Sequence, residues 1–325
     1  MNQQLMTDAL IRRQIFLGRY ANGTNRRAQK ELTSVLKAIE ERIAAGNLTR
    51  FQREWLIEQF DIVADIAFGE AEVLAPKEAD FTARVLNVGG IPSVEALAAT
   101  DVIAAFNEEK AELISGKKIQ KLTPYEMTRV YSEGEADRVL QIFRDGKLSG
   151  ESNYDISKKI NTVVKPQSRH NTNTLVRTLT NQAASVARKD TYELNDIEFE
   201  EYVTVLDART TVTCAKLSGN IYKDGAGVHP PAHYNCRSVR VPWFDGDTFV
   251  DDTGQLKAGN QGDEPTYGDW LEKQSKATQV EVLGDDRAEL FRSGELKIEQ
   301  FADDRGVEYT LDELESLYDV TIETA

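Results

Sequence analysis

The chain has 325 residues, 40% of them hydrophobic, and a formal net charge of −15. This length predicts two or three domains, and its two cysteines are too few for a disulfide scaffold. No apolar run of about 18 residues is present, which argues against a membrane-spanning helix. Residues 1–16 lack the apolar run and cleavage site of a signal peptide, so we expect a soluble protein.

The net charge is confined to the C-terminal quarter of the chain. Residues 244–325 hold 22 acidic and 7 basic side chains, whereas residues 1–243 hold 32 of each. An acidic segment of this kind is repelled by DNA and by anionic lipid. We expect it to be a solvated surface or, alternatively, a segment that docks on a basic partner.

Residues 1–150 are predicted to be a helical region. Within residues 32–46, apolar side chains recur every three or four positions, which predicts an amphipathic helix capped by Thr33 or Ser34 and ended by Gly46. The same period predicts further helices at residues 51–74, 94–116 and 123–150, the last starting at Thr123-Pro124. The region has no cysteine, no histidine and no glycine-rich phosphate loop, so nothing in it indicates chemistry.

Two helices are predicted at the start of the middle part, over residues 152–164 and 172–194. Residues 157–189 contain no acidic side chain. Their basic side chains are Lys158, Lys159, Lys165, Arg169, Arg177, Arg188 and Lys189. This basic window could contact a phosphate backbone or an acidic protein surface, but it lacks the interleaved aromatics of a single-strand binder. We expect a charged helix face.

After Asn195 the spacing of apolar side chains changes from a helical period to the alternation of a strand. Residues 198–207 alternate as in a strand, Ser218-Gly219-Asn220 indicates a turn between two extended runs, and residues 237–244 form another extended run ended by Pro242. These signals predict a small antiparallel sheet that packs against the preceding helix.

The C-terminal part begins with a Gly- and Asp-rich linker and continues with helices predicted at residues 266–284, 287–296 and 311–318. The predicted fold class is therefore α+β, mainly helical. It has three parts: a helical N-terminal region (1–150), a small α+β domain (151–245) and an acidic linker with a helical C-terminal segment (246–325).

Cysteine and histidine gather in one stretch of the middle part. Cys214, His229, His233 and Cys236 have the spacing C-x14-H-x3-H-x2-C. Thiolate and imidazole are ligands that zinc prefers, and four of them would close a tetrahedral structural site. A Cys214–Cys236 disulfide is the alternative, and it would stabilise the fold by about 3 kcal/mol. The third possibility is two buried free thiols with hydrogen-bonded histidines.

A catalytic role for these residues is the weaker hypothesis. Cys236, His233 and Asp207 could supply a nucleophile, a base and an orienting group, and a zinc-dependent enzyme would need an open coordination position and a general base. No HNH-type run accompanies the cluster. We therefore expect that the chain is not an enzyme.

Three ordered motifs resemble the phage Mu F-like head morphogenesis family, the minor capsid proteins of tailed phages. The sequences LDARTTVTCAKLSGNIYK and HPPAHYNCRSVRVP carry its central pattern. The matching positions are Asp207, Arg209, Thr210, Cys214, Gly219, Pro230, Pro231, His233, Cys236 and Arg237. The helix before the pattern is similar in its Arg177-Thr178 pair and Asn181, and the segment beginning TYGDWL is similar to one that often follows it.

The chain departs from the family pattern at two positions. Many members have a cysteine where Thr211 stands and another where Ser238 stands. His229 is not part of the pattern, so its place in a ligand set is inferred from spacing alone.

The resemblance implies a virion-associated protein that supports head assembly. Its partners would be the portal protein, the scaffold or the major capsid protein, together with packaged DNA, and no membrane. It would lie inside the head near the portal, and in the host cytoplasm during assembly. Arg209 and Arg237 would pair with Asp207 or with carbonyl groups and fix the loops. The alternatives are a zinc-dependent nucleic-acid-processing enzyme and a DNA-binding module that uses the basic window.

Overall fold

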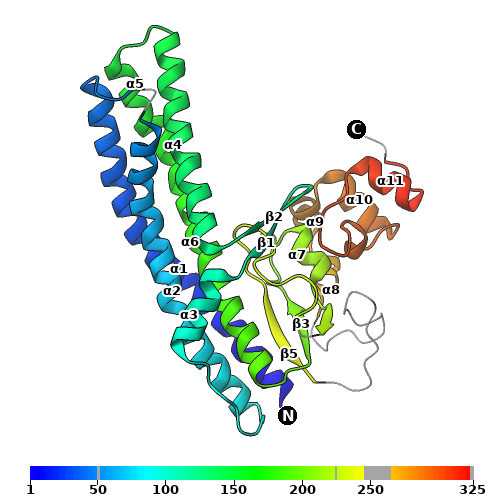
Figure 1. Ribbon diagram of the computed structural model, residues 1–325. Helices are drawn as coiled ribbons and strands as arrows, with labels where there is room; N and C mark the ends of the chain where they lie inside the picture. Colours follow the sequence, from blue (N-terminus) through cyan, green and yellow to red (C-terminus); the bar gives the residue numbers. More distant parts are fainter. Residues whose placement is uncertain (50–51, 224, 245–264, 323–325) are drawn as a thin grey trace.

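Four long helices lie side by side and form an elongated bundle in the computed structural model (Figure 1). They are α1 (Gln3–Ala44), α2 (Arg53–Val88), α4 (Pro124–Leu148) and α6 (Lys165–Leu194). The structure describes residues 1–49, 52–223, 225–244 and 265–322. A mainly helical α+β fold is confirmed.

One hydrophobic core joins the bundle helices. Leu36, Phe60, Leu140 and Leu179, one from each long helix, are all buried in it. Helix α6 packs closely on α2 along its length, and α1 packs on both. This core therefore contains residues from both sides of the predicted boundary at residue 150.

The start predicted for the first helix is wrong. Helix α1 begins at Gln3, with Asn2 accepting a hydrogen bond from the backbone N–H of Leu5, so Thr33 lies in the helix interior. Its hydroxyl donates to the Gln29 carbonyl one turn back, which a mid-helix threonine can do without ending the helix. By contrast, α4 starts as predicted, because Thr123 and Glu126 form a capping box around Pro124.

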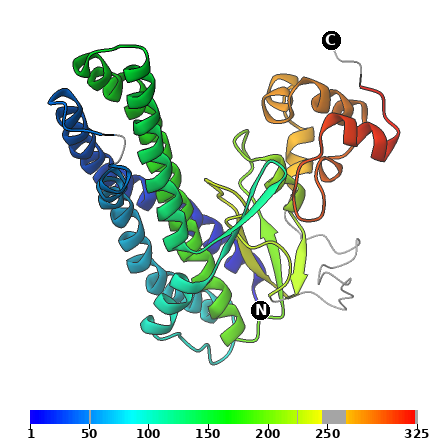
Figure 2. The ribbon, with the colours of Figure 1, turned by 45° about the horizontal axis from the view of Figure 1, so that its top comes forward.

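The helix predicted over residues 94–116 is also wrong in its second half. Helix α3 (Ala99–Glu108) ends early, and β1 (Ala111–Ser115) pairs with β2 (Lys118–Leu122) as an antiparallel hairpin. Gly116 adopts φ +57° in the turn, a conformation that glycine accepts readily. The hairpin extends from the bundle toward the sheet (Figure 2), and the Ile114 N–H donates to the Ala232 carbonyl.

Residues 153–194 form one nearly continuous helical run. Helix α5 (Asn153–Lys159) leads through a π-helical turn (Ile160–Val164) into α6. The two helices predicted in this region are therefore present, and α6 begins earlier than expected.

A three-stranded antiparallel sheet in the order β4-β3-β5 lies beside the bundle. Its strands are β3 (Phe199–Val203), β4 (Ile221–Lys223) and β5 (Val239–Trp243). Val239 and Val241 pack with Met6 and Leu10 of α1 and with Tyr192 of α6. The predicted small sheet packed on the preceding helix is thus confirmed.

Two details of the sheet differ from the prediction. The residues before Ser218 form a short helix, α7 (Val212–Leu217), rather than an extended run. Pro242 does not end the last strand but lies within it. Because β5 is an edge strand, the missing N–H of a proline is tolerated there.

The C-terminal segment packs on α7. Its elements are α8 (Tyr267–Glu272), α9 (Lys276–Leu283), α10 (Asp285–Ser293), a 3-10 turn (Ile298–Gln300) and α11 (Leu311–Tyr318). The single helix predicted over residues 266–284 is two helices, because Ser275 caps a new start at α9. Most of the predicted acidic linker, residues 245–264, lies outside the described residues. Among the helices described, none is long and apolar enough to cross a membrane.

A buried ion-pair network ties three bundle helices together. Glu78 of α2 is fully buried, and its carboxylate binds Arg13 of α1 at 2.6 Å and Arg188 of α6 at 3.4 Å. Arg188 is itself 3% exposed and also donates to Gln14. Because an unpaired charge is costly in the interior, this network requires all of its members.

We predict that Glu78→Gln lowers the free energy of unfolding by about 3 kcal/mol, because it leaves the buried guanidinium of Arg188 without a counter-charge. Urea denaturation of the full chain measures this. The control is Glu54→Gln on the same helix, whose side chain is 79% exposed and which should change stability by about 0.5 kcal/mol or less. Equal effects of the two substitutions would contradict the role assigned to Glu78.

Candidate metal centre

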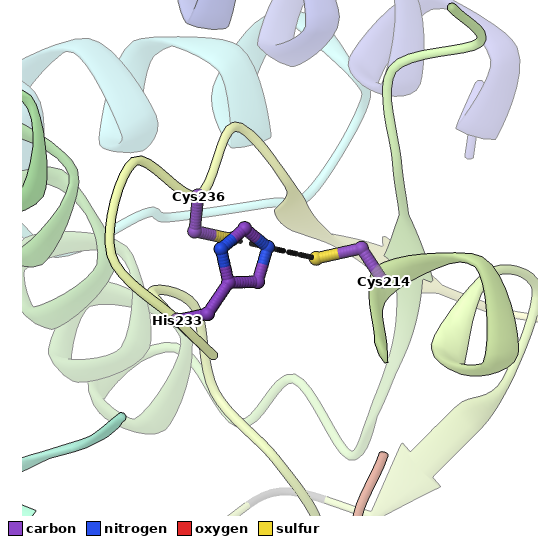
Figure 3. Close-up of side chains that lie close together, drawn as sticks. All are labelled: Cys214, His233 and Cys236. Carbon is purple, nitrogen blue, oxygen red and sulfur yellow. Dashed lines mark hydrogen bonds between the residues drawn. The ribbon is translucent and has the colours of Figure 1, made fainter. Parts of the chain in front are cut away.

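Three of the four predicted ligands come together in the structure. The Sγ of Cys214 lies 3.0 Å from Nε2 of His233 and 3.7 Å from the Sγ of Cys236 (Figure 3). The ligand atoms of all three residues lie within 4.8 Å of one another. We call these three residues the Cys2His cluster.

Local hydrogen bonds orient the ligands of the cluster. The Thr211 hydroxyl caps α7 by accepting from the Cys214 N–H, which places Cys214 in the first turn. Nδ1 of His233 faces the Tyr234 carbonyl at 2.8 Å. When Nδ1–H donates to this carbonyl, the neutral ring presents its Nε2 lone pair to Cys214. This is the tautomer in which an imidazole binds a metal through Nε2.

Helix α6 holds the loop that carries His233 and Cys236. The Asn235 N–H donates to the Thr178 hydroxyl at 3.1 Å, and its side-chain amide donates to the Thr174 hydroxyl at 3.0 Å. The Asn181 side chain donates to the Cys236 carbonyl at 3.1 Å. Thr178 and Asn181 are the helix positions shared with the family pattern, so the pattern marks the docking site of this loop.

The pKa values of the three cluster side chains are shifted in different directions. Burial raises the pKa of the Cys214 thiol well above its usual value. Burial also acts to raise the pKa of Cys236, but the hydrogen bond from Cys214 and the charge of His233 lower it overall. Burial acts to lower the pKa of His233, while the charge of Cys236 raises it overall. Cys236 is therefore the thiol that ionises first.

The fourth predicted ligand, His229, is not brought into the cluster. It lies between Lys189 and Arg240 in a separate small space, and burial followed by these two charges lowers its pKa. Its Nε2 has no hydrogen-bond partner among the described residues. The predicted four-ligand set is thus assembled only as a three-ligand set.

The two cysteines are free thiols here. Their sulfur separation of 3.7 Å is longer than the roughly 2.05 Å of a disulfide bond. Two thiols and one imidazole, all buried, fit the soft-ligand chemistry of zinc. No further His, Cys, Asp or Glu joins the group within the described part of the chain. Oxygen atoms beside the group include the Thr211 hydroxyl, 3.0 Å from Nε2 of His233, and the Tyr202 hydroxyl, 3.4 Å from the Sγ of Cys214.

The arginine pairing expected from the resemblance is present. Arg237 binds both carboxylate oxygens of Asp207, at 2.6 and 2.7 Å, and Arg209 binds one of them at 3.2 Å. The Thr210 hydroxyl closes the same loop on the Val205 carbonyl. Tyr267 of the C-terminal segment donates to the Asp207 carbonyl at 2.9 Å, so this loop also anchors α8.

The remaining motif positions have structural roles. Gly219 adopts φ +81° and its N–H donates to the Tyr202 carbonyl. A Cβ at this position would lie 3.0 Å from Thr266, so a side chain would be both strained and crowded. Pro231 follows a cis peptide bond in the loop that leads to His233.

The Cys-His-Asp arrangement weighed as a catalytic alternative is not assembled. Nδ1 of His233 faces a backbone carbonyl, and Asp207 binds two arginines instead. The sequence also did not reveal Tyr202, whose buried hydroxyl lies against both sulfur atoms. The only signal was its place in the alternating run of β3, which does not distinguish a core tyrosine from a site tyrosine.

Part of the basic window is paired within the protein. Lys159 binds Glu151, Arg188 binds Glu78, and Lys189 binds Glu109. Arg177 is held by Asn22 and Asn173. Three of the seven basic side chains of the window are thus bound to carboxylates, and Lys158 and Arg169 are exposed.

The loop ion pair should give a characteristic pH dependence. Hydrogen bonds and charge from Arg237 lower the pKa of Asp207 to about 2. Because the pKa of this carboxyl is lower in the folded than in the unfolded protein, the ionised carboxylate stabilises the fold at pH values above its ordinary pKa near 4. This stabilisation is lost as the pH falls toward 2. We predict that Asp207→Asn costs about 1 kcal/mol at pH 7, a modest value because the pair is partly exposed.

Urea denaturation of wild type and Asp207→Asn at several pH values would test this. The difference between the two proteins should shrink between pH 4 and pH 2. A difference that stays constant down to pH 2 would show that the carboxylate charge is not what stabilises the loop.

The comparisons agree with the geometry. Residues 137–241 match the family model described as "Phage Mu protein F like protein". The match covers the C-terminal part of α4, all of α6, β3, β4, the start of β5 and the Cys2His cluster. No curated protein and no solved structure matches the chain. Over residues 137–241 the chain is therefore similar to the phage Mu F-like family.

Proposed function

We propose that this chain is a minor structural protein of a tailed-phage head, which joins the procapsid near the portal and supports head assembly. The family match over residues 137–241 carries this proposal. The site is consistent with it, because Cys214 and Cys236 are 2% and 3% exposed. Thiols so deeply buried stabilise a fold more readily than they turn over a substrate. We therefore propose no enzymatic activity.

The bundle offers the surface for assembly partners. Its helices expose large apolar side chains that the core does not use, including Val73, Val88, Val130 and Leu148. These side chains are spread along α2 and α4, and each could pack against a partner protein. We assign the bundle to contact with the portal protein, with the scaffold or the major capsid protein as the alternatives. The site of action is the host cytoplasm during assembly and the virion interior near the portal afterwards.

Direct contact with packaged DNA is the less supported part of the proposal. Three of the seven basic side chains of the window are paired with carboxylates, and the C-terminal part is acidic. An acidic surface would keep this part of the protein away from DNA phosphates. Weak DNA binding that disappears at moderate salt is the expected result.

Quantitative mass spectrometry of purified particles tests the assembly role. Particles from cells that make this chain should contain few copies of it relative to the major capsid protein, and it should co-purify with the portal protein. Cys236→Ser should lower incorporation because it weakens the fold of the middle part, whereas His229→Gln should not. Absence from both particles and portal complexes would contradict the proposal.

We further propose that the Cys2His cluster holds one structural zinc ion. Zinc would neutralise the thiolates and fix α7, the His233 loop and β3 to one another. Thr211 or water would complete the coordination, as zinc is usually four-coordinate. A Cys214–Cys236 disulfide is the alternative to the zinc ion. Forming it would require the two sulfur atoms to move toward each other from their separation of 3.7 Å.

Metal analysis of the purified full chain distinguishes these states. We predict about one zinc per chain, lost in His233→Gln and in Cys214→Ser but retained in His229→Gln. Alkylation of the denatured chain without reductant should then find both thiols free. If the wild-type chain contained no zinc and neither cysteine could be alkylated without reductant, the disulfide would be established. If His229→Gln lost zinc, the four-ligand set that includes His229 would be correct.

The runner-up function, a zinc-dependent nucleic-acid enzyme, makes a different prediction. Zinc-loaded wild-type chain should then cleave single- or double-stranded DNA, and His233→Gln should not. The structural proposal expects no cleavage by either protein.

A further inference from the structure

A cavity of about 540 Å³ lies between α1, α6 and the loop that follows β3. This volume is within the range of roughly 300–1,000 Å³ found for small-molecule sites. One part of its wall is apolar and includes Ile11, Ile15, Leu206 and Val239. Cys236 of the Cys2His cluster and Gln14, which accepts a hydrogen bond from Arg188, also line this space.

Four arginines line the cavity, from three different parts of the chain. Arg19 lies on α1, Arg177 on α6, and Arg209 and Arg237 in the motif loops. The acidic side chains of the lining are Asp207 and Glu201. The lining therefore has a net charge of +2 from four arginines and two carboxylates. The apolar part of the wall screens this charge poorly.

The arginines of the lining differ in the partners that their guanidinium groups bind. Both carboxylate oxygens of Asp207 are engaged by Arg237, at 2.6 and 2.7 Å. Arg209 has a single 3.2 Å contact with the same carboxylate, and its side chain is 76% exposed. Within the described part of the chain, Arg177 donates only to the neutral amide oxygens of Asn22 and Asn173, at 2.9 and 3.1 Å.

Arg177 therefore contributes a cation without a carboxylate partner. Burial, and then the charges of Arg209 and Arg237, lower its pKa. Since an arginine stays protonated in proteins, this repulsion remains in the folded protein. An anion bound between these guanidinium groups would relieve it.

We propose that this cavity binds a phosphate monoester, with the phosphate between Arg177, Arg209 and Arg237 and the uncharged part of the ligand against the apolar wall of α1. A monoester carries close to two negative charges at neutral pH, which matches the excess of the lining. Guanidinium forks bind phosphate oxygens in pairs. A free mononucleotide and the 5′-phosphate of a DNA strand both present this chemistry.

Isothermal titration calorimetry of the full chain tests the proposal. The probes are deoxyadenosine monophosphate, inorganic phosphate, deoxyadenosine, and a short single-stranded oligonucleotide with and without a 5′-phosphate. Deoxyadenosine monophosphate should bind more tightly than inorganic phosphate, and deoxyadenosine should not bind. Tighter binding of the phosphorylated oligonucleotide would assign the site to a DNA end, and tighter binding of the mononucleotide would assign it to a free nucleotide.

Two variants and one control locate the binding. Arg209→Gln and Arg19→Gln both alter exposed side chains, so the chain should still fold, and each should raise the dissociation constant for the preferred probe. For Arg209→Gln we expect about tenfold or more, the effect of losing a charge-assisted hydrogen bond. Arg169→Gln, an exposed arginine of α6 outside the cavity, should leave binding unchanged. Thermal denaturation without ligand confirms folding of all three.

Several results would overturn the proposal: no binding of any phosphate probe at millimolar concentration, binding of deoxyadenosine as tight as that of its monophosphate, or equal losses in Arg209→Gln and Arg169→Gln. The measurement uses the isolated chain, so a negative result would leave the assembly role in the phage head untouched.

Discussion

The docking of one loop on helix α6 is the interaction on which the rest of the molecule depends. Thr178 and Asn181 bind the backbone of Asn235 and Cys236 from one side of the helix. The rest of α6 is packed into the bundle through Leu179 and the other apolar positions. A single helix is thus shared between a scaffold core and the Cys2His cluster. The loop also buries Ala232 and Cys236 against Tyr202 in a small hydrophobic cluster, so its conformation depends on this packing as well as on the polar contact with α6.

The acidic C-terminal part is joined to the same region by packing rather than by charge. Tyr267, Leu271 and Phe301 are buried with Val212 and Ala215 of α7. The ion pairs to the hairpin and to α7, such as Arg305–Glu112 and Lys216–Asp304, are substantially exposed, and exposed pairs contribute little. The excess negative charge is therefore carried on the outside of a packed unit. It influences which partners approach the protein, and it has little effect on how the unit is held.

The sequence predicted the elements whose signals are local. The capping box at Thr123 and the apolar period of α2 and α6 depend on residues within one or two turns, so α4, α2 and α6 were found. The β1-β2 hairpin was missed because Leu113 and Ile114 fit a helical period as well as a strand, and only pairing with residues 118–122 decides between them. His229 failed as a ligand for a related reason. Its spacing is compatible with zinc, but the fold places it in a separate small space that Lys189 and Arg240 also line.

The two positions at which this chain departs from the family pattern lie beside the cluster. Thr211 stands 3.0 Å from Nε2 of His233, and Ser238 bonds the Thr204 hydroxyl two residues after Cys236. Here hydroxyls occupy both places, and they form hydrogen bonds within the protein. The three-ligand cluster is held by Thr211 at the start of α7 and by the contact of its loop with α6.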